Sequence, residues 1–185
     1  MAQTVTNVTA AKPVVGGAVS VAPTTASLPT ATSTSLGTGW VGLGYISEDG
    51  LTNNNSPESE TIKAWGGDIV LTPVSGKEDT FTFTLIEAIN TDVLKVVYGD
   101  SNVTGTLGSG VTVNAKTDEM TAHAWCIDMV LRGNVAKRIV IPNGTISEVG
   151  EISYADADAV GYEITVTAFP NSSGVTHYEY LKSAS

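Results

Sequence analysis

The clearest alternation of apolar and polar residues lies near the middle of the chain. Phe81, Phe83 and Leu85 alternate there with threonines at residues 80, 82 and 84. A two-residue period puts the apolar side chains on one face of a strand and the threonines on the other. The pattern therefore predicts a half-buried strand within residues 79–89.

The residues after this strand carry the one good helix signal. Asn90 is a favoured N-cap residue, Asp92 would lie in the positively polarised first turn, and Gly99 would end the helix. We therefore predict a short α-helix over residues 91–98. Its buried face would comprise Leu94, Val97 and Tyr98.

Short strands and turns account for the first third of the chain. A brief alternation at 17–22 predicts one strand, and residues 40–46 and 61–72 predict two more. Between the last two lies a polar run, 47–60, with an Asp-Gly pair, three consecutive asparagines and a proline. Such a run is too long for a tight turn, so we predict a protruding loop.

The second half of the chain predicts strands alone. Residues 121–131 place His123, Trp125, Ile127, Met129 and Leu131 on one face. Gly133-Asn134 predicts a hairpin turn, and Pro142-Asn143-Gly144 predicts another after the return strand 135–141. Further strands are expected at 145–154, 160–169 and 175–181.

One short helix among many strands indicates a mainly β fold, either a β-sandwich or a partly open barrel. The 185 residues favour a single domain. Residues 1–15, which alternate poorly, predict a flexible N-terminal arm, and residues 16–185 predict the β domain.

The composition excludes several classes of function. Nine Lys and Arg against nineteen Asp and Glu give a net charge of −10, which leaves no basic stripe with which to bind phosphates. The single cysteine excludes an intrachain disulfide. No apolar run approaches the ~18 residues of a membrane span, and the N-terminus lacks signal-peptide features, so we expect a soluble polypeptide and no membrane partner.

Three patterns suggest chemistry, and each has a simpler reading. Gly37, Gly39 and Gly42 match a dinucleotide-binding pattern, but Ser/Thr-rich coil precedes them and no helix follows. His123 and Cys126 would project from opposite faces of a strand, so they cannot readily grip one metal ion. Asp-Ala-Asp at 156–158 reads as solvated turn residues rather than as a calcium loop. We expect no catalytic, cofactor or metal site, and no enzyme.

Several segments, in order, resemble the major tail (tail tube) proteins of siphophages, in particular those of phages that infect actinobacteria. These segments are GWVGLGYISEDGLT at 39–52, AWGGDIV at 64–70, FTFTLIEAINTDVLKVVYG at 81–99, RIVIPNGTISEVGEISY at 138–154 and AVGYEITVTAFPN at 159–171. Together they span most of residues 16–181.

The resemblance implies a structural virion protein that is made in the host cytoplasm and needs no cofactor. Its copies would self-assemble into rings, with six copies expected in each, and the rings would stack into the hollow tail tube through which phage DNA is ejected into the host. Its other partners would be the tape-measure, tail-tip and tail-terminator proteins, with double-stranded DNA passing through without sequence preference.

The resemblance also assigns residues to surfaces. The loop at 47–60 would reach the adjacent ring and become ordered on stacking, and the helix at 91–98 would lie near a subunit boundary. Acids on strands would line the lumen and repel DNA phosphates. The expected loop contacts are Glu48, Asp49, Asn54, Glu58 and Glu60. The expected helix contacts are Val93, Leu94, Val97 and Tyr98, and the expected lumen acids are Asp128 and Glu163.

A binding module is the alternative reading of the same residues. A β-sandwich that decorates a virion or a cell surface would share the strand content and the empty catalytic inventory. It would remain a monomer or a small fixed oligomer at high concentration, whereas a tail tube protein would form rings or tubes.

Overall fold

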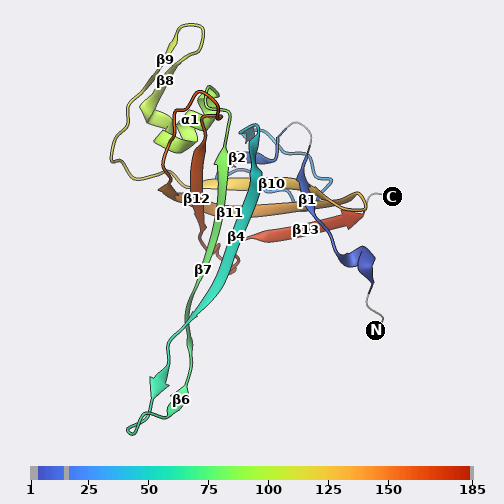
Figure 1. Ribbon diagram of the computed structural model, residues 1–185, viewed down its shortest axis with the longest axis vertical. Coiled ribbons are helices and arrows are strands. Elements are labelled where there is room, and N and C mark those ends of the chain that lie inside the picture. The colour runs from blue at the N-terminus through green and yellow to red at the C-terminus, as the bar shows by residue number, and fades with distance from the viewer. Residues whose placement is uncertain (1–3, 15–16, 184–185) are drawn as a thin grey trace.

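The protein is mainly β, with one short α-helix and an open sheet (Figure 1). The computed structural model describes residues 4–14 and 17–183. Most strands belong to one nine-stranded sheet, whose main path runs β3-β2-β10-β11-β12-β7-β4. β1 joins this sheet by pairing with β10, and β13 joins it by pairing with β11. The predicted mainly β class is therefore confirmed, and the sheet does not close into a barrel.

The elements follow one another along the chain as β1 (Ala11–Pro13), β2 (Val19–Pro23), β3 (Val41–Gly42), β4 (Ile46–Ser59), β5 (Ile62–Lys63), β6 (Ile69–Leu71), β7 (Val74–Leu85), α1 (Thr91–Tyr98), β8 (Val103–Thr106), β9 (Gly110–Val113), β10 (His123–Leu131), β11 (Val135–Val149), β12 (Tyr162–Ala168) and β13 (Tyr178–Ser183). Short 3₁₀ turns occupy Val5–Asn7 and Asp100–Asn102. Two small hairpins, β5–β6 and β8–β9, complete the set.

The predicted helix and the alternating strand are both confirmed. α1 spans Thr91–Tyr98, the Asn90 side chain accepts a hydrogen bond from the Asp92 N–H, and Gly99 caps the other end with a φ of 95°. In β7, Phe81, Phe83 and Leu85 are buried. Local residue preference and the two-residue period agree with the tertiary structure in this part of the chain.

The prediction of a loop at 47–60 is wrong in its secondary structure. Residues 46–59 form β4, which pairs antiparallel with β7 along its length. The predicted strand at 61–72 is instead the tip of this hairpin, because β5 and β6 pair around the turn at 64–68. Asn and Pro disfavour strands, but β4 is the last strand of the sheet and pairs on one side only, where a proline is tolerated.

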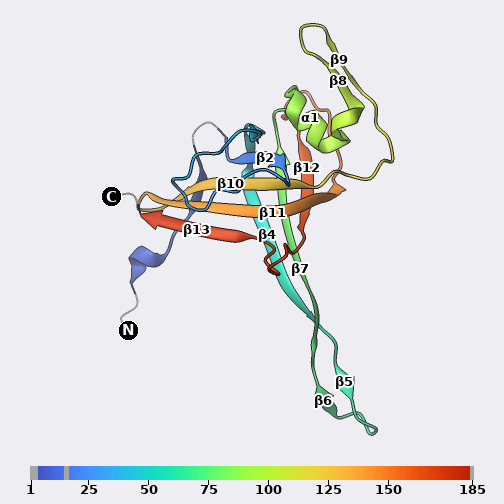
Figure 2. The same cartoon turned by 180° about the vertical axis from the view of Figure 1, so that it is seen from behind.

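The β4–β7 hairpin leaves the body of the molecule as a long two-stranded arm. In Figures 1 and 2, β4 and β7 extend together well beyond the remaining strands, with β5 and β6 at the far end. Fourteen residues of β4 correspond to roughly 45 Å of extended chain. The predicted protrusion is therefore present, but it is a paired ribbon and not a loop.

A predicted turn at Pro142-Asn143-Gly144 is also wrong. β11 runs without interruption from Val135 to Val149, with a register shift opposite the start of β10. Gly144 permits this path, because a Cβ there would lie 2.9 Å from atoms of both Trp125 and Val166. The Trp125 Nε1–H donates to the Gly144 carbonyl at 3.0 Å. The residues that suggested a turn instead bend one long strand over the largest core side chain.

The hairpin turn predicted at Gly133-Asn134 is present. Both residues have positive φ, and the register pairs Leu131 with Val135 across a three-residue turn. On the N-terminal side, residues 11–13 of the predicted arm form β1, while residues 1–3 and 15 lie outside the described part of the chain. The flexibility of that arm stays a prediction.

The core lies between the inner face of the sheet and α1. Its largest fully buried side chains are Trp125, Phe81, Leu43, Leu85, Ile127, Ile141 and Ile164. α1 adds Val93, Val96 and Val97 from its buried face. Because side chains alternate along a strand, this packing turns the intervening side chains of the same strands outward.

Candidate functional site

One face of the sheet is lined almost entirely by hydroxyl groups. β12 alternates buried Tyr162, Ile164, Val166 and Ala168 with outward Glu163, Thr165 and Thr167. Pairing with β7 brings Thr84, Thr82 and Thr80 beside these three outward residues. We call this surface the threonine face, and it comprises Thr80, Thr82, Thr84, Glu163, Thr165 and Thr167.

The threonine face continues onto both neighbouring strands. In β4, Thr52 pairs with Thr82 and Asn54 pairs with Thr80. In β11, Thr145 pairs with Thr167, and Glu148 pairs with Thr165. Hydroxyl groups hydrogen-bond across the strands: those of Thr82 and Thr165 lie 3.0 Å apart, and the Thr167 hydroxyl donates to that of Ser147 at 2.9 Å. No Lys or Arg occupies these paired positions, so the surface is neutral to acidic.

The two predicted lumen acids lie in different surroundings. Glu163 is exposed on the threonine face. Asp128 instead accepts two hydrogen bonds from Arg138, to Oδ1 from Nε at 2.6 Å and to Oδ2 from Nη2 at 2.8 Å. A carboxylate held by a guanidinium contributes little net charge to a surface. Of the two residues, Glu163 alone presents a carboxylate that the structure does not pair with a cation.

Arg138 also fixes the irregular segment that follows β2. Its Nη1 donates to the carbonyls of Ala31 and Thr34, at 3.0 and 2.6 Å. Hydrogen bonding to Asp128 raises the pKa of Arg138, and burial offsets part of that rise. The buried guanidinium thus holds the 31–34 segment against β10 and β11, although its burial carries a desolvation cost.

A buried carboxylate lies at the base of the long hairpin. Asp79 of β7 is 1% exposed. Its oxygens accept hydrogen bonds from Asn53 at 2.9 Å, from the Thr176 hydroxyl, and from His177 Nδ1 at 2.6 Å. Burial raises the pKa of Asp79, but these hydrogen bonds outweigh it and hold the pKa below its ordinary value. The cluster ties the hairpin to the segment before β13.

The predicted loop contacts lie along β4 and its end. Glu48 and Asp49 occupy an irregular stretch of β4, where the register with β7 shifts between Ile46 and Leu51. Asn54 lies on the threonine face, and Glu58 lies opposite Gly76 further along the hairpin. The Glu60 N–H donates to the Pro73 carbonyl at 3.1 Å. Their contact with a second copy stays a prediction.

The predicted helix contacts are mostly occupied within the chain. Val93 is fully buried, and Leu94 and Val97 are less than 10% exposed. Tyr98 is half-buried and packs edge-on against Tyr162, with ring centroids 6.0 Å apart. This burial leaves little of the three aliphatic side chains for a second copy to touch.

Cys126 and the glycines at 37–42 are among the residues that suggested chemistry in the sequence. Cys126 is buried, and burial is the main reason why its pKa rises to about 12. Gly37 and Gly39 precede β3 and Gly42 is its last residue, and in the described chain no helix begins directly after these glycines. No group of three His, Cys, Asp or Glu residues that could hold a metal ion is found within residues 4–14 and 17–183. In that same range, no helix is long and apolar enough to span a membrane.

Sequence reasoning missed two features of this molecule. The Asp79 cluster joins residues nearly a hundred positions apart, so no local spacing could reveal it. The apolar hairpin tip was interpreted as a returning strand, although two adjacent glycines at 66 and 67, both with positive φ, mark the turn. Gly-Gly flanked by short apolar runs is the signal that could have found it.

A family model described as phage tail tube protein matches residues 6–184, which is nearly the whole chain. No curated protein matches the sequence.

Proposed function

The chain belongs to the phage tail tube proteins, a structural family of the virion tail, and from that membership we propose that its copies form stacked rings around a channel for double-stranded DNA. The proposal includes six copies per ring, synthesis in the host cytoplasm, and contacts with tape-measure, tail-tip and tail-terminator proteins. The chain would work by geometry, without a reaction of its own.

The observation that carries this proposal is a four-stranded section of sheet with two unpaired edges. β12, β7 and β4 continue the sheet from Thr145–Val149 of β11. Among the described residues, Thr145–Val149 pairs with β12 alone, and β4 pairs with β7 alone. Unpaired strand edges promote aggregation, and soluble proteins normally protect them. Two such edges in one chain therefore favour a structure in which neighbouring copies pair with them.

The direction of the strands favours closure between copies. All three internal pairings of the four-stranded section are antiparallel. β4 of one copy can therefore pair antiparallel with Thr145–Val149 of the next, and the same contact repeats around a ring. Such a head-to-tail contact is heterologous. It gives a closed ring when a whole number of rotations from one copy to the next adds up to 360°. Closure removes both edges from every copy.

The size of the resulting barrel supports a ring of about six copies. Four strands from each of six copies give about 24 strands. With a spacing of about 4.8 Å and a tilt near 40°, that barrel is roughly 48 Å across between backbones. Three copies would give roughly half that width, which side chains from opposite walls would nearly fill. We therefore propose six copies, which leave room for a DNA duplex.

The threonine face is the proposed wall of the channel. It lies on the four strands that would form the barrel, on the side away from the chain's own core. Hydroxyls and carboxylates without Lys or Arg offer no counter-charge to phosphates, so a duplex could slide without pausing. Glu163 is the proposed lumen acid, whereas Asp128 is proposed to stabilise the fold through Arg138.

The long hairpin is proposed to contact the adjacent ring, and the outer end of α1 is proposed to lie near a subunit boundary.

The proposed function can be tested by electron microscopy of the purified protein at increasing concentration. We expect rings or tubes with a central channel. Particles that remain single at all concentrations would contradict the proposal and favour a decoration module.

A further inference from the structure

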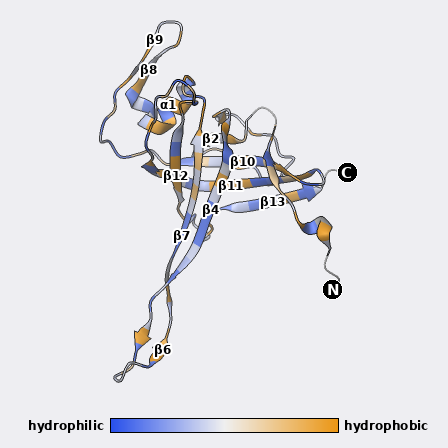
Figure 3. Cartoon of the chain, viewed as in Figure 1, coloured by the Kyte–Doolittle hydropathy of each residue, from blue (hydrophilic) through white to orange (hydrophobic). Residues whose placement is uncertain are grey.

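The far end of the β4–β7 hairpin is a cluster of exposed apolar side chains. Trp65 lies at the turn and is fully exposed, with a relative exposure of 106%. The large apolar residues around it are each between 48% and 68% exposed, and they are Ile62, Ile69, Val70, Leu71 and Val74. We call these six residues the hairpin tip. Figure 3 shows the hydrophobic colour at this end of an otherwise polar ribbon.

The hairpin tip is held in a defined shape. The Ala64 N–H donates to the Asp68 carbonyl at 2.7 Å, and the Gly67 N–H donates to the Ala64 carbonyl at 3.0 Å. β5 and β6 pair on either side of this turn. Trp65 is therefore presented on a closed turn, so less conformational entropy is lost when it is buried by a partner.

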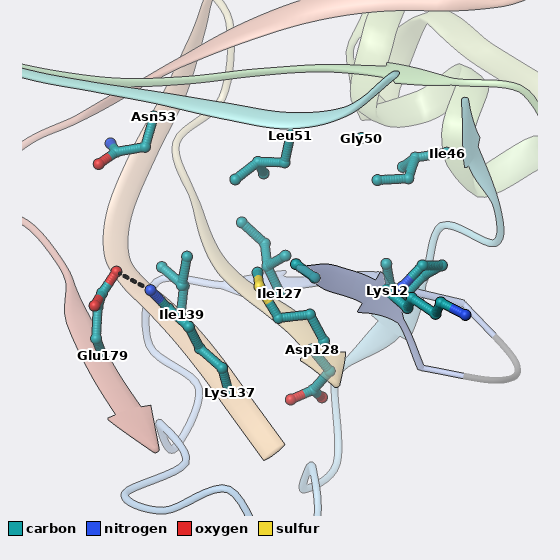
Figure 4. A pocket seen from close by; sticks show the side chains of 14 residues that line it. Lys12, Ile46, Gly50, Leu51, Asn53, Ile127, Asp128, Lys137, Ile139 and Glu179 are labelled. Atoms are coloured by element: carbon teal, nitrogen blue, oxygen red, sulfur yellow. Dashed lines mark ion pairs between the residues drawn. The ribbon is translucent and has the colours of Figure 1, made fainter. Parts of the chain in front are cut away.

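A cavity of about 320 Å³ opens on the body of the molecule, between β4 and the β10–β11 hairpin. Figure 4 shows Ile46 and Leu51 of β4 facing Ile127 and Ile139 across it. Met129 and residues of β1 complete its apolar lining. This volume is at the lower end of those that hold small ligands, and it suits one large side chain.

The hairpin tip cannot reach this cavity within its own chain. The cavity is lined by the inner end of β4, whereas the hairpin tip lies at the opposite end of the same long ribbon (Figures 1 and 2). An exposed apolar group and an apolar pocket elsewhere on the same molecule form a heterologous contact that propagates from copy to copy. A second copy is therefore the partner that carries the matching element.

The charges near the two surfaces are complementary. Lys12 of β1 lines the cavity (Figure 4). Two other charged residues that line the cavity are already paired, Lys137 with Glu179 at 2.8 Å and Asp128 with Arg138 at 2.6 Å. The hairpin carries Glu60, Lys63 and Asp68 within five residues of Trp65, so this end of the hairpin has a net charge of −1. A hairpin end of net charge −1 would thus approach the ammonium group of Lys12, which favours this orientation of the two copies.

We propose that the hairpin tip of one copy inserts Trp65 into the cavity between β4 and the β10–β11 hairpin of a copy in the adjacent ring. This inference rests on the proposed function, and it names the anchor residue and the receptor of the contact between rings. Buried tryptophans are enriched among the residues that dominate interface energetics, so Trp65 would carry much of that contact.

The contact can be tested by cross-linking within the full-length protein. Ala64→Cys places a thiol beside Trp65, and Ala11→Cys places one in the cavity lining, while both the anchor and the larger apolar residues remain. The two variants are mixed, concentrated and treated with a short bis-maleimide. Cys126 does not interfere, because it is buried and its pKa is raised to about 12. Gly108→Cys, in the open β8–β9 turn, replaces Ala11→Cys in the control mixture.

We expect a cross-linked dimer from the Ala64→Cys and Ala11→Cys mixture and none from the control mixture. Tubes of the unmodified protein, together with no product from that mixture, would overturn this inference and leave the proposed function standing. An unmodified protein that forms no tubes would contradict the proposed function, while a specific product in the same sample would still support the contact.

A second measurement removes the anchor itself. Trp65→Ser should raise the critical concentration for tube formation at least tenfold, whereas Leu107→Ser should leave it unchanged. Leu107 is also an exposed apolar residue, 63% exposed, and lies in the turn between β8 and β9. Equal critical concentrations for the two variants would overturn the inference.

Discussion

Replacing Arg138 with alanine should destabilise the folded chain far more than replacing its only other arginine. The Arg138 side chain is 8% exposed and pairs with Asp128 through two hydrogen bonds. It also satisfies the carbonyls of Ala31 and Thr34. Arg132, in the turn between β10 and β11, is exposed, and its side chain makes no ion pair with another described residue.

The expected loss of stability in Arg138→Ala follows from the Asp128 carboxylate that the substitution leaves without its partner. Removing one partner of a buried ion pair costs about 3–5 kcal/mol, because the remaining charge is no longer compensated. Asp128 keeps 24% of its side-chain surface exposed, so water can recover part of this loss and we expect about 3 kcal/mol. For a chain of this size that corresponds to a fall in Tm of roughly 6–12 °C. Arg132→Ala should cost less than about 0.5 kcal/mol.

Urea unfolding of the two variants, followed by tryptophan fluorescence under conditions where the protein is monomeric, measures the difference. Asp128→Asn, alone and combined with Arg138→Ala, completes a double-mutant cycle. The two costs should be strongly non-additive if the pair acts as one unit. Equal unfolding free energies for Arg138→Ala and Arg132→Ala would refute the role assigned to this ion pair.

Three further variants test other parts of the structure. Gly144→Ala should lower the free energy of unfolding by about 1–3 kcal/mol, because its Cβ would overlap Trp125 and Val166. Gly108→Ala is the control, because a Cβ there would lie in open space and should change the free energy of unfolding little. Equal effects of the two variants in urea unfolding would contradict this. The pKa of Asp79 is lowered in the folded chain, so ionised Asp79 should stabilise the fold above pH 3.8, the ordinary pKa of the group, and this contribution should be lost as the pH falls below that value. The unfolding free energies of the unmodified protein and Asp79→Asn should therefore converge in acid. A difference that does not shrink would refute this. Glu163→Lys in phage particles should slow DNA release while Asp156→Lys should not; equal release rates in tubes of normal structure would contradict a lumen position for Glu163.

Local signals in the sequence were sufficient where a segment's own residues determine its structure. The cap at Asn90, the stop at Gly99 and the alternation of Phe81 and Phe83 gave α1 and the core part of β7 at their observed positions. Each signal there agrees with the neighbours that the segment packs against in the fold.

The sequence was misleading where a distant partner decides the structure. β4 is rich in Asn and polar residues, and it forms a strand because β7 supplies hydrogen bonds along its length. Pro142-Asn143-Gly144 continues β11 because Trp125 packs over Gly144. Asp128 was expected to line the lumen because of its place on a strand. Its ion pair with Arg138, ten residues later, could not be inferred from the local pattern, and its position in a tube stays a prediction. Glu163 has no such partner in the structure, and its exposed position agrees with the prediction without testing it.

The proposed ring requires that neighbouring copies complete two edges, β4 and Thr145–Val149 of β11. Amide hydrogen exchange, compared between unassembled protein and purified tubes, measures whether they do. We expect the outward-facing amides of both edges to exchange rapidly in the unassembled chain and to become strongly protected in tubes, while the buried centre of β12 changes little. Amides of either edge that exchange at the same rate in both forms would contradict it.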